Sequence, residues 1–148
     1  MKARNLASPR DTVGRDDPAS EAARILARHD VRAVLVVDSD GGFVDALSDS
    51  ELLRALLPSY VEDDESLARV LEESASEVLF QRLEGRTVGD LVPADREADP
   101  VVNGEDTLVE SASAMVRSRA SMVGVVDDGR LIGGISIDDL LTHLLGRR

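Results

Sequence analysis

Residues 125–141 read VVDDGRLIGGISIDDLL, and residues 36–53 read VVDSDGGFVDALSDSELL. The two stretches align without a gap except in the turn after the Val-Val-Asp triplet, which is one residue shorter in the second stretch. Extended outward, the match covers residues 20–57 and 109–145. Self-similarity within a chain indicates duplicated structural units, and two copies suit a pair that buries a shared face.

Each copy has the same order of local signals. Apolar residues at helical spacing precede a short run of β-branched residues, which is typical of a buried strand. An Asp- and Gly-rich turn then leads to a second apolar strand, and a second helix follows. Asp17 and Asp106 are expected to cap the first helix of each copy. The expected strands are 33–37, 43–47, 122–126 and 131–135, the second helices are 48–57 and 136–145, and extended lead-ins lie at Thr12-Val13 and Val101-Val102.

The predicted fold class is α/β. Two helix-strand-strand-helix halves, related by a pseudo-twofold axis, are expected to pack through their sheets with the helices outside. Motif 1 is assigned to residues 1–60 and motif 2 to residues 87–148. Residues 61–86 carry apolar residues at helical spacing and are predicted to form an inserted amphipathic helix or linker. This helix either covers apolar surface or acts as a dimer-contact or partner-docking element.

The composition argues against several classes of function. The 148 residues carry a net charge of −12, which repels nucleic acids and anionic membranes, and aromatic residues, at 2%, leave almost nothing for stacking on bases. The sequence has no cysteine, no metal-binding motif and no run near the roughly 20 apolar residues of a membrane span. The N-terminus lacks a signal-peptide core. We therefore expect a cytoplasmic protein without a nucleic-acid, membrane or metal partner.

The motifs of common enzyme sites are also missing. Gly133-Gly134 precedes a helix, but there is no Walker lysine, no dinucleotide fingerprint and no Gly-x-Ser-x-Gly elbow. No nucleophile–base pair is evident from the sequence. A non-catalytic binding protein is predicted, with an unrecognised small-molecule enzyme as an alternative.

The two quoted stretches resemble the end of a CBS (cystathionine β-synthase) domain. The shared pattern is a Val-Val-Asp strand end, a Gly turn, a Gly-flanked apolar strand and then Thr/Ser-x-x-Asp at the start of the last helix. Such domains come in pairs, called Bateman modules, and the resemblance covers nearly the whole chain outside the inserted helix. It implies a regulatory module that binds AMP, ADP, ATP or S-adenosylmethionine between the copies, as a regulatory ligand and not as a required cofactor.

The resemblance also implies which residues meet the ligand. The acid of Thr/Ser-x-x-Asp holds the ribose hydroxyls and the Ser or Thr can meet phosphate. These roles fall on Ser136 and Asp139 in motif 2 and on Ser48 and Glu51 in motif 1. Arg32 stands where several family members place a basic residue that contacts phosphate. Adenine would lie against Thr12, Val13, Arg32, Ala33 and Val34, or against Val101, Val102, Ser121, Met122 and Val123.

The residues themselves leave other roles open. A carboxylate accepts two hydrogen bonds from a cis-diol and stays ionised in a first helical turn, which suits Asp139. However, Ser-x-x-acid is also the signature of a capping box, and Ser48 with Glu51 fits that role fully. Arg32 needs no ligand if its stem covers the core. Because copy two has Ser121 at the position of Arg32, one asymmetric site is expected in place of two equal ones.

Isolated pairs of this kind resemble proteins that form disc-like homodimers, and twofold dimers are the commonest oligomers. We therefore expect a homodimer in which an adenosine-type ligand shifts the packing of the pair, and an unidentified downstream protein responds to the change. The alternative is a ligand-free scaffold retained for dimerisation or interaction.

Overall fold

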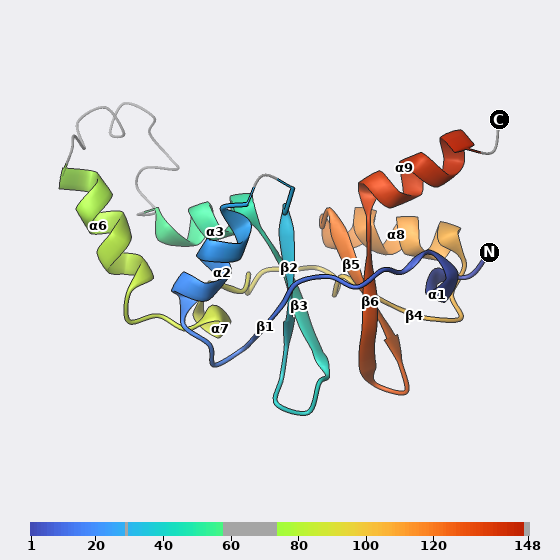
Figure 1. Cartoon of the computed structure of the whole chain (residues 1–148), viewed down its shortest axis with the longest axis horizontal. Coiled ribbons are helices and arrows are strands. Elements are labelled where there is room, and N and C mark those ends of the chain that lie inside the picture. The colour runs from blue at the N-terminus through green and yellow to red at the C-terminus, as the bar shows by residue number, and fades with distance from the viewer. Residues whose placement is uncertain (29, 58–73, 147–148) are drawn as a thin grey trace.

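The computed structural model describes residues 1–28, 30–57 and 74–146. It contains two halves of the same construction, each a three-stranded sheet flanked by two helices (Figure 1). The predicted α/β class and the duplicated helix-strand-strand-helix order are confirmed. The first half holds β1 (Thr12–Gly14), α2 (Ala19–Leu26), β2 (Ala33–Val37), β3 (Phe43–Ser48) and α3 (Asp49–Leu56). The second half holds β4 (Val101–Asn103), α8 (Leu108–Ser118), β5 (Met122–Asp127), β6 (Arg130–Ser136) and α9 (Ile137–Gly146).

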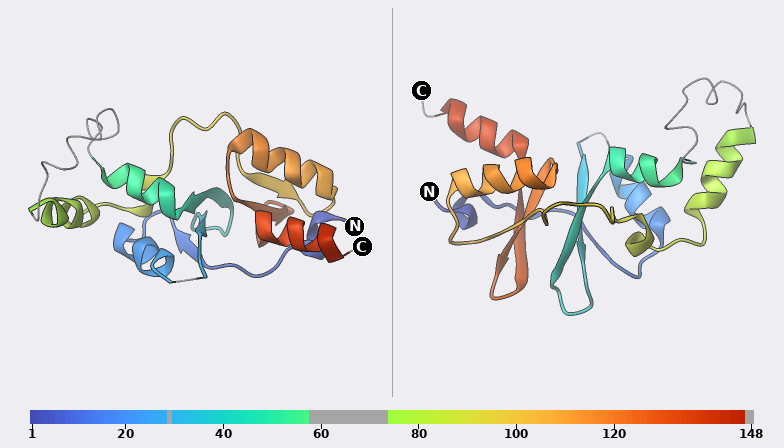
Figure 2. Two further views of the ribbon diagram at one scale, coloured as in Figure 1. Left: turned by 90° about the horizontal axis from the view of Figure 1, so that it is seen from above. Right: turned by 180° about the vertical axis from the view of Figure 1, so that it is seen from behind.

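The two sheets share their topology and their register. In each sheet the short lead-in strand runs parallel to the buried strand, which pairs antiparallel with the next strand, giving β1-β2-β3 and β4-β5-β6. The antiparallel register shifts at Val36/Val37 and at Val125/Val126, so the irregularity is duplicated too. Gly41 and Gly129, with φ of +80° and +78°, supply the left-handed backbone conformation of each turn. Figure 2 shows the two helix pairs on opposite sides of the central strands.

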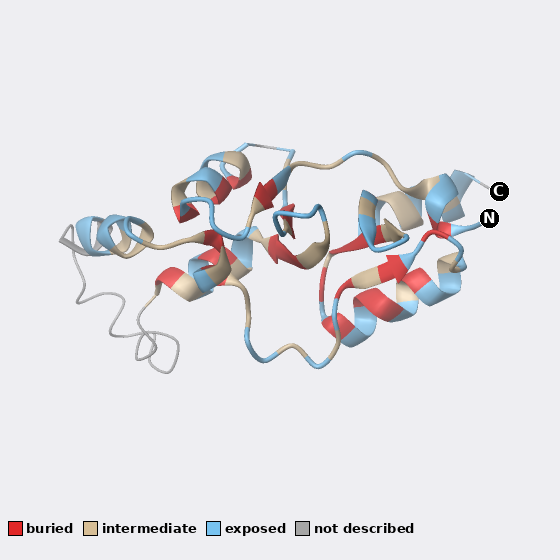
Figure 3. Cartoon of the chain, turned by 90° about the horizontal axis from the view of Figure 1, so that it is seen from below, coloured by how far each residue is buried: buried red, intermediate tan, exposed pale blue. Residues whose placement is uncertain are grey.

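The central strands are apolar on both faces because each face has a different partner. Val34 and Val36 belong to the core that β2 shares with its own helices. Ala33 and Leu35 alternate with them and therefore face the second half. The cluster between the halves consists of Ala33, Leu35, Ala46 and Met122, with Leu131 packed against it. The halves pack through their sheets as predicted, and Figure 3 shows buried residues gathered on the strands and on one face of the helices.

The segment ahead of each lead-in strand packs on the opposite half. Helix α1 (Ala3–Leu6) places the fully buried Ala3 in the core of the second half. Helix α7 (Val88–Leu91) places Val88 and Leu91 in the core of the first half. The two repeats are therefore interlocked, because the short helix that precedes each repeat in the chain completes the core of the other repeat. The predicted boundaries at residues 60 and 86 separate the motifs along the sequence, but each core contains residues from both sides of these boundaries.

The starts of the first helices differ from the prediction. Neither Asp17 nor Asp106 is the N-cap, a position held by Pro18 in α2 and by Thr107 in α8. Each aspartate instead accepts the backbone N–H of the residue three positions upstream, at 2.7 and 2.9 Å. Both aspartates therefore close the turn between the lead-in strand and the helix, a common use of a short acidic side chain.

Part of the predicted insertion is helical. Helix α6 (Ser74–Leu83) packs Leu79 and Leu83 against the first-half core, next to α3. Gly85 follows its end with a φ of +77°, as the sequence indicates for a helix stop. The remaining part of the predicted helix, with its expected apolar residues at 67–71, lies outside the described residues.

The two halves are expected to unfold as one unit, because the cluster between the sheets belongs to both. Leu35→Ala truncates a fully buried side chain in this cluster and is expected to lower the free energy of unfolding by about 2–5 kcal/mol in a single transition. Leu53→Ala, the same change at a side chain that is 58% exposed, is expected to cost less than about 0.5 kcal/mol. Urea unfolding followed by circular dichroism measures both costs, and two separate transitions would contradict the expectation.

Candidate functional site

Two clefts lie where the halves meet, at positions related by the internal repeat. The first, called here the Asp139 cleft, has a volume of about 310 Å³. It lies between the starts of β2 and β5 and the junction of β6 with α9, and Arg10 reaches it from the segment before β1. Its lining residues include Arg10, Arg32, Ala33, Ser121, Met122 and Ser136, together with the carboxylates of Asp30 and Asp138. Asp139 is not itself part of the lining, but it contacts two of the lining residues, Ser136 and Arg10. Both halves therefore contribute to one cavity, and five of the residues predicted to meet a ligand come together there.

Asp139 is held in place by the start of its own helix. Its carboxylate accepts the Ser136 N–H at 2.8 Å, and its own N–H donates to Ser136 Oγ at 3.1 Å, so the expected capping box forms. The same carboxylate forms an ion pair with Arg10. Both side chains keep about a quarter of their surface exposed, at 24% for Arg10 and 29% for Asp139. The buried Nε of Arg10 finds no acceptor among the described residues.

The second cleft, called here the Glu51 cleft, occupies the related position on the other side of the halves. Its volume is about 340 Å³, and it lies between the start of α3, the end of α8 and the segment before β4. Ser48 and Glu51 form a second capping box, with distances of 3.0 and 3.1 Å against 2.8 and 3.1 Å for Ser136 and Asp139. The remaining lining residues include Arg54, Arg96, Arg117 and Arg119. The capping alternative for Ser48 and Glu51 is thus realised in the structure.

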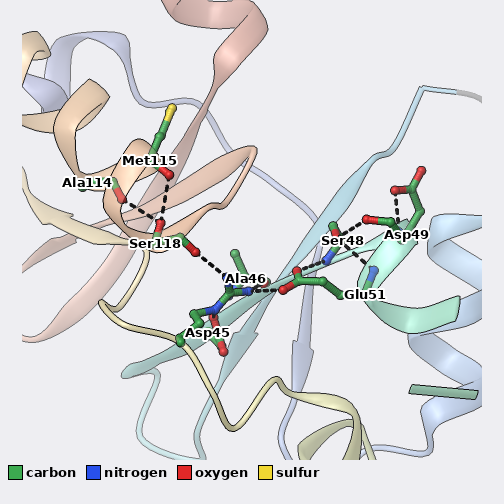
Figure 4. Close-up of polar contacts among 10 residues, drawn as sticks. Asp45, Ala46, Ser48, Asp49, Glu51, Ala114, Met115 and Ser118 are labelled. Carbon is green, nitrogen blue, oxygen red and sulfur yellow. Dashed lines mark hydrogen bonds and ion pairs between the residues drawn. The ribbon is translucent and has the colours of Figure 1, made fainter. Parts of the chain in front are cut away.

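Arg96 fills part of the Glu51 cleft with a buried network. Its Nε donates to Asp45 Oδ1 at 2.8 Å and its Nη2 donates to Glu51 Oε2 at 2.7 Å. Nη2 also donates to Ala46 O at 2.7 Å, and Nη1 donates to Ser118 O at 2.9 Å. The dashed lines in Figure 4 meet between Asp45, Ala46 and Glu51 of the first half and Ser118 of the second. The Arg96 side chain is 8% exposed, so its charge is almost fully removed from water.

Asp45 has a perturbed pKa because it is buried. Loss of solvation raises the pKa of its carboxyl above the ordinary value, although the Ala46 N–H and the Arg96 guanidinium both lower it. The negative charge of Glu51 adds to the increase. The folded state therefore binds this proton more tightly than the unfolded state. Its contribution to stability is present below the ordinary pKa and is lost as the pH rises through the raised one.

The other predicted site residues are divided between the cores and the surface. Val13 and Val34 belong to the first-half core, and Val102 and Val123 belong to the core of the second half. At 0–5% exposure these four side chains are packed against protein, so a ligand would reach their backbone at most. Thr12 is exposed on strand β1, and Val101 is half-buried on β4.

The ion pairs at the clefts involve Arg10, Asp45 and Arg96, which were not among the predicted ligand contacts. Asp45 had a signal in the sequence, since a carboxylate inside an otherwise apolar strand needs a buried partner. The second copy has Gly133 at the corresponding position, so the repeat marks Asp45 as a departure from its own pattern. Arg96 has no comparable signal, because it stands in an irregular segment whose path depends on the packing of both halves.

The comparison with family models identifies the class of protein. The model of the CBS domain matches residues 3–58 and 88–146, once for each half. The matches cover most of the chain, and they coincide with the two duplicated units. The chain therefore belongs to the CBS-domain family, as a tandem pair of CBS domains.

Solved structures of CBS-domain proteins have the same fold. A CBS domain-containing protein from Kribbella flavida is 38% identical, covering 98% of this chain and 99% of its own, with a TM-score of 0.80. CBSX2 from Arabidopsis thaliana, solved in complex with AMP, is 21% identical, covering 100% of this chain and 99% of its own, with a TM-score of 0.68. The CBS domain pair of MJ0100, solved with 5-methylthioadenosine and S-adenosyl-L-methionine, is 19% identical over 100% of this chain and 98% of its own, with a TM-score of 0.68. No curated protein matches the chain.

Two further findings concern the part of the chain that the structure describes. None of its helices combines the length and the apolar character that crossing a membrane requires. It also holds no group of three or more His, Cys, Asp or Glu side chains arranged to bind a metal ion.

The two arginine bridges are expected to differ in their contribution to stability. Arg96→Leu leaves the carboxylates of Asp45 and Glu51 without their guanidinium partner and is expected to lower the free energy of unfolding by about 3–5 kcal/mol. Arg10→Leu, the matched change in the other cleft, breaks a pair that is about a quarter exposed and is expected to cost about 1 kcal/mol or less. Urea unfolding at pH 7 compares the two, and a larger cost for Arg10→Leu would contradict the assigned difference.

Proposed function

We propose that this protein is a non-catalytic regulatory sensor that binds an adenosine-type ligand in the Asp139 cleft. The observation that carries the proposal is a fixed carboxylate next to a cavity that both halves line, in contact with the lining residues Arg10 and Ser136. Asp139 is oriented by its capping box, and its remaining interaction is a partly exposed ion pair with Arg10. The AMP complex of CBSX2 and the 5-methylthioadenosine and S-adenosyl-L-methionine complex of MJ0100 support this class of ligand.

Each part of an adenosine ligand has a matching group in the cleft. A carboxylate accepts hydrogen bonds from both hydroxyls of a ribose in bidentate fashion, which is the role we assign to Asp139. Ala33 and Met122, which meet across the halves, offer an apolar wall for the adenine base. Arg10 and Arg32 line the same cavity and provide positive charge for a phosphate, in spite of the net charge of −12 and of the carboxylates of Asp30 and Asp138 in the same lining.

Binding requires an exchange of partners at Asp139. The ribose hydroxyls take the place of Arg10 on the carboxylate, and the released guanidinium gains an anionic partner if the ligand carries phosphate. We therefore favour AMP, ADP or ATP over S-adenosylmethionine, whose sulfonium is a cation. Because the cavity is lined by both halves, a ligand that prefers one arrangement of the pair shifts the equilibrium toward it. A downstream protein that contacts both halves would respond to that shift.

The carboxylate can be tested without removing the helix cap. Asp139→Asn keeps an oxygen that accepts the Ser136 N–H but removes the negative charge. Any loss of AMP affinity then reports the charge-assisted hydrogen bonds to ribose and not the helix cap. These are worth about 1.5–3 kcal/mol, and AMP affinity is expected to fall by about 10- to 100-fold in isothermal titration calorimetry. Glu110→Gln changes the acid of the capping box at the start of α8 and serves as the matched control, with unchanged affinity. Wild-type protein that binds none of AMP, ATP and S-adenosylmethionine at millimolar concentration would favour the ligand-free scaffold.

We also propose that the protein forms a homodimer through α8 and α9. The outer surfaces of these helices form an apolar groove of about 630 Å³. Val109 and Val116 on α8 and Leu144 on α9 are 79%, 78% and 61% exposed. Arg119 is the one charged residue among those that line the groove, so two strongly acidic copies approach there without opposing carboxylates. A twofold contact covers this surface on both copies at once, as isologous dimers do.

The dimer surface predicts a pair of variants with different oligomeric states. Val116→Asp places a charge in the middle of the proposed contact and is expected to give a monomer of 15.9 kDa in size-exclusion chromatography with light scattering. Leu53→Asp changes an exposed residue of similar character on α3, in the first half, and is expected to leave the dimer intact. Wild-type protein that is monomeric at micromolar concentration would contradict the proposal.

A further inference from the structure

The two clefts begin from nearly the same local structure. The pair Ser48 and Glu51 corresponds to Ser136 and Asp139, and each pair forms a capping box at the start of the last helix of its half. In both clefts an arginine from the segment before the lead-in strand bridges to the acid. By position in the repeat alone, each cleft has the carboxylate that an adenosine ligand needs.

The clefts differ in how firmly the arginine is held. Arg96 uses all three guanidinium nitrogens, which donate to two carboxylates and two backbone carbonyls. Arg10 in the other cleft bridges to Asp139, keeps three times the exposed fraction of Arg96, and has a buried Nε with no acceptor among the described residues. A ligand that displaced Arg96 from Glu51 would leave Asp45 as a buried carboxylate without its guanidinium partner, which costs several kcal/mol. Displacement of Arg10 leaves no such buried pair.

The cause of the difference is a substitution within the repeat. Copy two has Gly133-Gly134 where copy one has Asp45-Ala46. In copy two the backbone of Ser8 pairs with Gly134, with N–H···O distances of 2.9 and 3.1 Å. A Cβ at Gly133 would lie 2.8 Å from the carbonyl oxygen of Ser8, so this close approach requires glycine.

In copy one the corresponding residue is Asp45, whose buried carboxylate accepts the N–H of Ala46. The segment before β4 instead sends the side chain of Arg96 to Asp45 and to the carbonyl of Ala46. The Arg96 guanidinium also contacts Ser118 at the end of α8, so the residue that fills the cleft ties the first half to the second.

We infer that Arg96 occupies the carboxylate of Glu51 as a built-in substitute for a ligand, which limits the protein to one adenosine-type ligand per chain. This inference rests on the proposed function of the Asp139 cleft. Arg96 presents its positive charge to Glu51 where a ligand would present its ribose hydroxyls. Arg96 therefore stays in place in the Glu51 cleft, and the Asp139 cleft is the one in which a ligand exchanges with a protein side chain.

The stoichiometry of the wild-type protein is the first test. Isothermal titration calorimetry of the full chain with AMP is expected to give one site per chain, and Asp139→Asn is expected to weaken that site. Two equivalent sites per wild-type chain would overturn the role of Arg96 and leave the proposed function intact. Absence of any binding by the wild-type protein would overturn the proposed function itself.

A second variant removes the internal occupant together with its buried partner. The double change Asp45→Gly and Arg96→Ala restores the pattern of copy two, leaves no unpaired charge at residue 45, and frees Glu51. It is expected to raise the stoichiometry of AMP from one to two per chain. Arg117→Ala, which removes another arginine that lines the same cleft and is not part of the α8/α9 groove, is the matched control and is expected to remain at one. A folded double variant, by circular dichroism and elution volume, that still binds one AMP would overturn the inference.

Discussion

Removal of apolar surface from water between the two sheets is the interaction on which the rest of the structure depends. Leu35 and Met122 belong to the apolar cluster between the halves, while the opposite faces of their strands are covered by the helices of their own half. The contact holds the junctions of β3 with α3 and of β6 with α9 on either side of the pair. Both clefts exist because two small sheets, each with one face left uncovered by its own helices, are packed against each other.

The two clefts then show how a duplicated structure becomes asymmetric. The internal repeat gives both clefts an acid that belongs to a capping box. Because the net charge is −12, an anionic ligand also needs a local positive charge. One arginine is partly exposed and exchangeable, and the other is enclosed by four acceptors. Since a buried charge is tolerated when its partners are in place and costly when they are lost, the enclosed arginine stays in its cleft. A symmetric scaffold can therefore carry a single exchangeable site.

The sequence was sufficient for the fold and for part of the candidate site. The repeated alternation of strands and helices predicts the sheet order, because apolar periodicity and turn residues act locally. It also brings Ser136 and Asp139 to a capping box and places Arg32 and Met122 near the same junction. Prediction from periodicity was less accurate at the helix starts, where the backbone geometry decides which residue is the N-cap. Periodicity also could not show which apolar residues face a core and which face a cleft.

By itself, the sequence determined that the chain forms two equivalent helix-strand-strand-helix units, because local patterns of apolar and turn residues were present twice. It also determined the chemistry available to the site, through the acids at positions 51 and 139. Only the tertiary structure decided that α1 and α7 complete the opposite halves, and that Arg10 and Arg96 reach those acids. The physical reason is that irregular segments take their path from the surfaces they cover, and those surfaces form only when the two units pack together.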